Sequence, residues 1–505
     1  MWIRESLPGR CRVRWMPQVR ASMLPGRPGF PRRIYGGIRG LWLAAALVLP
    51  GLVAGCVNQQ KEVAHYEKIL HAHPATTAAA LRVPRECTLA EAMRLANDNN
   101  EQLAISGEDY LQALIARNRA FASFLPTIGL DVQDFQQQEF NTAGFPPDFT
   151  QFFQTHYFNL PLQTQLNVNA WRDAAAIQAA GTTVRQRRAL LRDMQSNLLL
   201  EVAQTYYGVL SEARSVKVLR ATLGVQKANV ASMKRKQKAG IVVRLSVLQS
   251  EADESATRVL LTQARNSVQK GRAVLAFLIG APNLNGARLV NRFDPPAHVP
   301  ALRQLDQISL RQRQDLRAAD DAVATSRHEV SAAVAEYFPS VSIDLNTFLS
   351  KQSFPGDSWW NSLFSVNLPI FEGGVIYDDI RTAYSRLRQA MLARQRLAQR
   401  ILEQVRIARD NWISSVKLVR NLLTEMRAAR ASFHQARHSF QAGLATNLDV
   451  ITAQDRALAA QLAYEKAHYN ERVDMLALLR MTGRLTYPAI AQLAAAGGTH
   501  VVADK

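Results

Sequence analysis

Two segments of this chain, 121–170 and 337–371, alternate between apolar and polar residues. Such a period of two places one set of side chains on each face of a β-strand. One face is then apolar and the other is rich in amides, as in a membrane β-barrel with lipid outside and water inside. The apolar set comprises Ile128, Leu130, Val132, Phe158, Leu160, Leu162, Leu166, Val168, Ala170, Val341, Ile343, Leu345, Phe364, Val366, Leu368 and Ile370.

Aromatic and basic residues are distributed as this interpretation requires. The two segments hold 18 of the 38 aromatic residues of the chain. Membrane barrels carry aromatic girdles where lipid meets water. No Lys or Arg lies between Ala120 and Trp171, in a chain that has 61 of them. A soluble hairpin packed on helices would also alternate, but it would not explain the missing cations or the excess of aromatic rings.

Charge and motifs exclude several other functions. The formal net charge is +20, yet the cations are spread along helices with acids between them. The densest cluster, Lys234–Lys238, is typical of a solvated helix end, so we expect no nucleic-acid partner. The chain contains no P-loop, dinucleotide fingerprint, Ser-His-Asp order or metal-binding cluster. We therefore expect no enzyme activity and no cofactor.

The first 55 residues have the pattern of a targeting segment. Arginines precede an apolar run that ends in Leu52-Val53-Ala54-Gly55-Cys56. This sequence resembles a lipobox, in which cleavage leaves a lipid-modified Cys56 as the new N-terminus; the alternative is a plain secretory signal. Because the basic part is unusually long, either Met1 or Met23 could be the start. Residues 56–87 are then predicted to be an extended, lipid-anchored tether.

Helix signals follow the tether. Thr88 and Glu91 have the spacing of a capping box, and the helix they start is predicted to reach about Ser123. A proline-free stretch predicts one helix over 171–239, about 100 Å long at 1.5 Å per residue. Gly240 then breaks the chain before a helix over 245–279. These elements form a first repeat, 88–280, followed by a proline-rich linker, 281–305.

The pattern then starts again. Pro126 returns as Pro339, Leu160-Pro161 as Leu368-Pro369, and Gly240 as Gly443, at offsets of 213, 208 and 203 residues. Residues 306–483 are therefore predicted to be a second helix-strand-strand-helix-helix unit. A loose tail, 484–505, ends the chain.

Each chain would supply four strands, which cannot close a barrel. Open strand edges are not tolerated in lipid, so the chain must oligomerise. Three copies give twelve strands, an even number within the known range. The expected fold is mainly α with a small β part, in which a trimeric α-barrel carries a 12-stranded membrane β-barrel.

The chain after Cys56 resembles the outer-membrane efflux protein (TolC-like) family. The resemblance rests on the duplicated unit and on the segments Arg313–Arg317, Tyr337–Val341, Leu368–Gly374 and Ala442–Val450. Gln314 replaces the proline usual in the first of these. The resemblance implies a lipoprotein of the outer membrane that extends into the periplasm. It also implies a homotrimer that contacts a periplasmic adaptor protein, an inner-membrane pump and outer-membrane lipid.

The function implied is that of a passive exit duct for small molecules in a tripartite efflux pump. The alternatives are the exit duct of a type I protein-secretion system and, less in keeping with two long hairpins, a periplasmic adaptor. No residue identifies the exported substrate or the partner pump, or shows whether the duct rests open or closed.

Several positions carry expected roles within this resemblance. Asp449 matches an acid of the ring that narrows the periplasmic mouth, although a first-turn acid at a helix N-terminus would look the same. The residue three positions later is Thr452 and the match in the first repeat is Ser246, so we expect at most one ring. Hairpin tips and adaptor contacts are expected at Gly240, Gly443, Val243, Leu245, Leu248 and Leu444.

Overall fold

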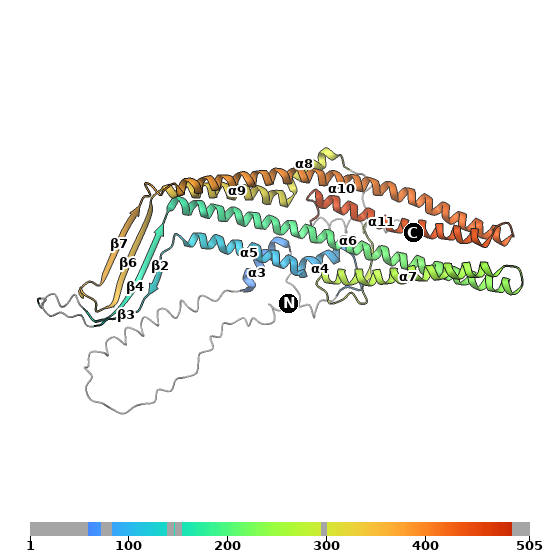
Figure 1. The fold of residues 1–505 in the computed structure, drawn as a ribbon, viewed down its shortest axis with the longest axis horizontal. Coiled ribbons are helices and arrows are strands. Elements are labelled where there is room, and N and C mark those ends of the chain that lie inside the picture. Colours follow the sequence, from blue (N-terminus) through green and yellow to red (C-terminus); the bar gives the residue numbers. More distant parts are fainter. Residues whose placement is uncertain (1–58, 72–82, 139–145, 147–153, 294–299, 487–505) are drawn as a thin grey trace, which may run out of the picture.

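A computed structural model describes residues 59–71, 83–138, 146, 154–293 and 300–486. Within these ranges a small sheet lies at one end of a long, narrow bundle and two helical hairpins end at the other (Figure 1). The helices are α3 (Gln59–Leu70), α4 (Leu89–Asn99), α5 (Glu101–Ala122), α6 (Ala170–Lys238), α7 (Arg244–Leu278), α8 (Leu302–Gln312), α9 (Gln314–Val334), α10 (Val375–Gln441) and α11 (Asn447–Met481). The strands are β1 (Glu86–Cys87), β2 (Thr127–Leu130), β3 (Gln133–Gln136), β4 (His156–Val168), β5 (Arg288–Leu289), β6 (Ser340–Lys351) and β7 (Trp360–Asn367).

The expected fold class, mainly α with a small β part and a duplicated unit, is confirmed. Each half runs from a helix through strands into a long helix and a shorter returning helix. The long helices α6 and α10 have 69 and 67 residues, and the returning helices α7 and α11 have 35 residues each. At 1.5 Å per residue the long helices are about 100 Å in length.

The helices continue the order of the strands. The main sheet has the order β2–β4–β6–β7, with β3 also paired to β4, and all of its pairings are antiparallel. Beside it the helices pack in the matching order α5–α6–α9–α10 (Figure 1). Toward the tips, α7 packs on α6, and α11 packs on both α6 and α10. The chain therefore forms a single layer in which four helices lie in the same order as the four strand positions of the sheet.

The strand register aligns the two faces that the sequence predicts. Directly opposed residues of an antiparallel ladder lie on the same face. One face has rows such as Leu166–Ile343–Phe364 and Val168–Val341–Val366, whereas the other has Gln163–Asn346–Asn361. Exceptions include Asp134, Thr164, Thr347 and Ser362 on the apolar face, and Phe135, Tyr157, Phe348 and Leu363 on the polar face. Phe364 and Val366 are 65% and 57% exposed in the single chain, so an apolar surface remains uncovered.

The first strand is interrupted, which the alternation did not predict. β2 ends at Leu130 and β3 begins at Gln133, and both pair with β4. Opposite the gap lies Pro161, which has no N–H to donate and only accepts from the Asp131 N–H at 3.0 Å. Val132, expected within the strand, lies in this gap.

Both outer edges of the sheet are open. Within the described residues, β2, β3 and β7 each pair on one side only. Strand directions alternate across the four positions, so β7 of one copy and β2 of another would meet antiparallel. The strand directions at the two edges of the sheet therefore permit antiparallel pairing with further copies of the chain.

The segment expected to be an extended tether contains α3, so that expectation was wrong. Tyr66 and Leu70 are buried against the bundle, and the Tyr66 hydroxyl donates to Glu108 at 3.2 Å. A Cβ added to Gly107 would lie 2.6 Å from the Tyr66 ring, so glycine provides the space for this contact. The carbonyl of Leu70 accepts from Gln195 at 2.9 Å. These long-range contacts, which no local period reveals, order the helix.

The first predicted helix is two helices. The capping box is confirmed, with the Thr88 N–H donating to the Glu91 carboxylate at 2.7 Å. However, α4 stops at Asn99, and the Asn100 side chain accepts from the Leu103 N–H to start α5. Asn100 also donates to the carbonyl of Leu278 at 3.0 Å, so the break is stabilised by the end of α7.

The linker and tail contain more order than expected. In the linker, β5 pairs in parallel with β1. In the tail, Leu485 is fully buried, and residues 487–505 lie outside the described part. Among the described helices, none is both long enough and apolar enough to cross a membrane.

A matched pair of substitutions tests the assignment of the two sheet faces. We expect Leu166→Arg to lower the amount of protein in the membrane fraction, because a cation on the lipid face is destabilising, from less than about 1 kcal/mol near the interfaces up to about 2–4 kcal/mol at the bilayer midplane. Gln165→Arg, one residue away on the amide-rich face, should leave insertion almost unchanged. Flotation of membranes with immunodetection measures both. Equal loss in the two variants would contradict the assignment.

Candidate functional site

The end of the molecule opposite the sheet consists of two hairpin tips. Gly240 joins α6 to α7 with φ +69°, and Gly443 joins α10 to α11 with φ +75°. At each tip an N–H after the glycine closes the helix: Ile241 donates to Lys236 and Leu444 to Ser439, at 2.9 and 2.8 Å. Positive φ values favour glycine, which accounts for a glycine at each of the two turns.

The apolar residues predicted at the tips are exposed in the single chain. Leu444 is 84% exposed and Val243, which is the N-cap residue of α7, is 67% exposed. Leu245 and Leu248 follow in the first turns of α7 and are at least half exposed. These side chains form an apolar end surface with nothing covering it in the single chain.

Asp449 caps its own helix. It is the third residue of α11, and its carboxylate accepts from the N–H and hydroxyl of Thr446 at 2.8 and 2.6 Å. These hydrogen bonds hold the pKa of Asp449 below its usual value. The exposed carboxylate therefore stays charged. The capping role is shown; a role in lining the mouth remains a prediction.

Polar contacts join the two hairpins near their tips. The Asn447 side chain donates to the Ser246 carbonyl at 3.2 Å and to the Ser250 hydroxyl at 3.1 Å. The ammonium of Lys236 lies 4.3 Å from the ring centroid of Phe440. The sequence did not reveal these pairings because each joins residues about 200 positions apart.

A pair of carboxyl groups lies farther from the tips, at the same junction. Asp253 of α7 lies beside Asp455 of α11, close enough for the two to titrate together, and Gln226 donates to Asp253 at 2.7 Å. Burial, and for Asp253 also the charge of Asp455, raises the pKa of both groups above the usual aspartate value. Two carboxyls this close share a proton, so this contact weakens as the pH rises through their titration.

A buried network of charges lies midway along the bundle. Arg313, only 4% exposed, donates to Asp315 at 2.6 Å and to Gln404 at 2.8 Å. Beside it, Arg480 donates to Asp193 at 2.8 Å. The four charged groups come from α6, α11 and the α8–α9 junction, and Gln404 belongs to α10. From the sequence, Arg313–Arg317 was identified only as a family motif, and the contacts of this network were not predicted.

The pKa values of the two acids in this network are shifted in opposite directions. Burial alone would raise the pKa of Asp315, but the hydrogen bonds and charge of Arg313 outweigh burial and the pKa is lowered. For Asp193, burial outweighs the attraction of Arg480 and the pKa is raised. Asp315 is therefore the acid that depends most on its arginine.

The cysteines carry no visible chemistry in the described part. Cys56, the predicted lipidation site, lies outside the described residues. Cys87 is buried and free, and burial raises the pKa of its thiol to about 11. Such a thiol is inert at neutral pH.

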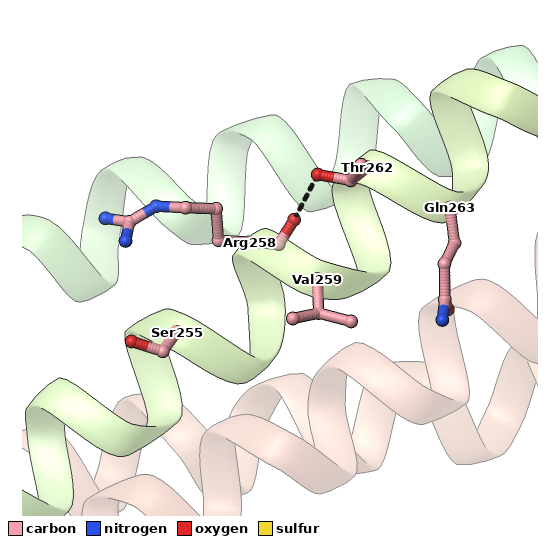
Figure 2. A pocket seen from close by; sticks show the side chains of 5 residues that line it. All are labelled: Ser255, Arg258, Val259, Thr262 and Gln263. Atoms are coloured by element: carbon pink, nitrogen blue, oxygen red, sulfur yellow. Dashed lines mark hydrogen bonds between the residues drawn. The ribbon is translucent and has the colours of Figure 1, made fainter.

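No enclosed ligand site is evident among the described residues. A hollow of about 380 Å³ is lined by one helix alone, through Ser255, Arg258, Val259, Thr262 and Gln263 of α7 (Figure 2). The Thr262 hydroxyl there donates to the backbone carbonyl of Arg258 at 2.9 Å. A hollow lined by a single helix is an open groove on the surface and does not enclose a ligand. The same part of the chain contains no group of His, Cys, Asp and Glu residues suited to hold a metal ion.

Comparison with known proteins identifies relatives over most of the chain. The family described as "Outer membrane efflux protein" matches residues 93–281 and 305–484. The chain is 25% identical over 292 residues to the alkaline protease secretion protein AprF of Pseudomonas aeruginosa, covering 55% of this chain and 60% of that protein. It is 25% identical over 324 residues to the outer membrane efflux protein BepC of Brucella suis, covering 61% and 68%.

Solved structures share the fold. The Campylobacter jejuni CmeC outer membrane channel superposes with a TM-score of 0.70 at 16% identity, covering 80% of this chain and 89% of that one. The outer-membrane channel OprN gives 0.67 at 20% identity, covering 78% and 89%. The sequence alignment to AprF spans about 60% of that protein's length, whereas the structural matches extend over most of both chains.

Removing Arg313 should destabilise the bundle. In Arg313→Met the half-buried Asp315 and Gln404 lose their buried partner, and breaking a buried pair this way costs about 3–5 kcal/mol. The midpoint of urea unfolding should fall accordingly. The control is Arg394→Met, which removes an exposed pair with Asp320 and should cost less than about 1 kcal/mol. Similar losses in both variants would show that the buried network contributes nothing special.

Proposed function

This chain belongs to the outer membrane efflux protein family, and we propose that it forms the outer-membrane channel of a tripartite efflux pump. In this proposal it is a passive exit duct through which small molecules cross the outer membrane. Membership of a family of efflux channels also confirms the expectation that the chain is not an enzyme.

The observation that carries the proposal is the one-sided sheet with two open edges. An apolar face suits lipid and an amide-rich face suits a wet lumen, but four strand positions cannot enclose a lumen. Three copies would supply twelve and pair β7 of each with β2 of the next. The same trimerisation would bring the helices of the three copies together into a cylinder about 100 Å long. The proposed homotrimer is thus a barrel with a helical conduit attached.

The periplasmic end would contact the other components of the pump. The apolar surface formed by Leu444, Val243, Leu245 and Leu248 supports docking of an adaptor protein, which in turn contacts an inner-membrane pump. We propose that Cys56 is lipidated and anchors each protomer in the outer membrane. In support, only two residues lie between Cys56 and Gln59, the first residue of the docked helix α3.

A second candidate, the exit duct of a type I protein-secretion system, has one specific observation in its favour. The relative AprF is named as a secretion protein for an alkaline protease. Both candidates use the same duct, and they differ in the pump at its periplasmic end. A periplasmic adaptor, the third possibility weighed from the sequence, is not favoured, because the family that matches is one of outer-membrane channels.

Purification from membranes tests the duct itself. We expect a detergent-solubilised trimer by light scattering and discrete ion conductance in planar bilayers. Mass spectrometry of the same preparation should find a lipid-modified Cys56 at the N-terminus. A stable monomer that is soluble without detergent would overturn the channel. An unmodified N-terminus would overturn only the lipid anchor.

Asp449 allows a test of the mouth. If three copies surround the entrance, Asp449→Ala should weaken the preference for cations over anions, because a ring of carboxylates attracts cations. Because the cap is lost too, Thr446→Ala serves as a control that removes the capping partner and keeps the charge. Reversal potentials in asymmetric salt measure selectivity. Unchanged selectivity in Asp449→Ala would leave only the capping role.

A further inference from the structure

Three arginines lie together on the surface where α6 packs against α9. Arg188 and Arg192 are four residues apart on α6 and therefore share one face of that helix. Arg317 is in the first turns of α9, at the end of the family motif Arg313–Arg317, and its guanidinium donates to the carbonyl of Arg311 at 3.0 Å. Arg188 and Arg317 are exposed and Arg192 is half-buried. We call Arg188, Arg192 and Arg317 the arginine cluster.

The positive charges of the cluster repel one another without compensation. Burial lowers the pKa of Arg192, and the charges of Arg188 and Arg317 lower it further. No acid is among the groups that shift this pKa. Within the described part of the chain, none of the three arginines forms an ion pair. A bound anion would therefore relieve a repulsion that the chain itself leaves uncompensated.

The acids closest in sequence to the cluster are engaged by other arginines. The pairs are Asp193 with Arg480, Asp315 with Arg313, Asp320 with Arg394 and Asp321 with Arg185, at 2.8, 2.6, 2.8 and 3.0 Å. Each carboxylate already has a cationic partner, so none is free to neutralise the cluster.

Trp171 indicates that the cluster faces the outside of the proposed duct. It is 52% exposed at the start of α6, and its ring stacks on Phe338 where the sheet meets the helices. Aromatic rings at such a junction lie at the membrane–water interface and face lipid. Arg192 follows Trp171 by 21 residues, which is three heptads. Residues seven apart stay on one side of a supercoiled helix and drift by only about 20° per heptad on a straight one, so Arg192 faces the same side as Trp171.

The cluster is remote from the membrane, from the hairpin tips and from the edges of the layer. At 1.5 Å per residue, Arg192 lies about 30 Å from Trp171 and about 70 Å from Gly240 along α6. The helices α6 and α9 are the inner members of the layer α5–α6–α9–α10, whereas copies in the proposed trimer would meet through the outer members. The cluster would therefore stay open in the trimer.

We propose that the arginine cluster is a binding site for the carboxylates of an acidic peptide segment outside the conduit. This inference rests on the proposed function, which supplies the membrane and the trimer, and it adds a contact midway along the molecule. Planar guanidinium groups bind carboxylates through paired hydrogen bonds, and three of them suit neighbouring carboxylates of one chain. Such charge complementarity speeds association and selects partners.

The position of the cluster favours a peptide over a lipid. Headgroup phosphates of the membrane that holds the sheet would lie at the level of Trp171, about 30 Å from Arg192 along the helix. An arginine side chain cannot cover that distance. A peptide on the periplasmic side can approach the cluster directly.

The test uses the detergent-solubilised channel and fluorescently labelled hexaglutamate as the probe. Hexaglutamine with the same label is the uncharged control. Fluorescence anisotropy measures both affinities. We expect hexaglutamate to bind with an affinity that falls steeply with salt, and hexaglutamine to bind at least about tenfold more weakly.

Two matched variants test the site. The cluster variant combines Arg188→Gln, Arg192→Gln and Arg317→Gln, and it should bind hexaglutamate at least about tenfold more weakly. The control removes the same charge at exposed positions of α6, α9 and α10, through Arg187→Gln, Arg327→Gln and Arg400→Gln. Arg187 precedes Arg188 but points about 100° away around the helix, so the control should stay within about twofold of the unmodified channel.

Light scattering checks that each variant is a trimer. If the cluster variant does not assemble, Arg188→Gln alone replaces it, because this side chain is exposed. The single change should weaken binding of hexaglutamate by about threefold.

Four results would overturn the proposal. The first is an absence of hexaglutamate binding at low salt, and the second is an equal loss of affinity in the control variant, which would mean that net charge alone attracts the peptide. Binding of glycerol phosphate that depends on the cluster, without binding of hexaglutamate, would identify a phosphate site instead. A changed ion selectivity of the cluster variant in planar bilayers would place the arginines in the lumen. If the unmodified protein conducts no ions at all, the proposed channel fails, and this outcome is separate from the other four.

Discussion

The structure depends on the need of every backbone N–H and C=O group for a partner. Inside the sheet this need is met, but among the described residues β7 on one side and β2 with β3 on the other each have a row of unpaired groups. In lipid such groups cost several kcal/mol each, so an isolated protomer cannot occupy a membrane. The apolar face makes the same demand, because it is exposed unless lipid covers it. Both requirements would be met in the proposed trimer, in which copies of the chain close on one another.

The helices inherit their arrangement from this sheet through the junction at Asn169. Its side chain accepts from the Arg172 N–H to start α6 and donates to the carbonyl of Ala335 at 3.2 Å. The ring of Trp171 stacks on Phe338 with centroids 5.1 Å apart. The start of one helix is thereby fixed to the end of α9. Strands and helices pack at different spacings. The fixed joint keeps the helices in the same order as the strands where the chain passes from the sheet into the helical bundle.

The sequence predicted the features that repeat locally. Alternation identified both strand faces, the tip glycines followed from their common offset, and the length of α6 followed from the absence of proline. Features that depend on distant contacts escaped prediction: α3 is ordered by Tyr66 against Gly107, and the gap in the first strand is set by Pro161 on its neighbour. Arg313 was noticed as part of a signature, but its partners Gln404 and Asp315 come together only in the folded chain.

The packing that stabilises the helical bundle is unevenly distributed along its long axis. Midway, where Arg313 and Arg480 are buried, the helices share one large apolar core. Toward the tips the apolar contacts between the hairpins shrink to a small cluster around Leu223, Leu261 and Leu458. Beyond it the hairpins meet through side-chain hydrogen bonds, each contributing about 0.5–1.5 kcal/mol net and exchangeable with water. Separating the tips therefore costs far less than separating the middle. In the proposed duct, the hairpin tips would therefore be the part that separates most easily, while the core and the sheet stay assembled.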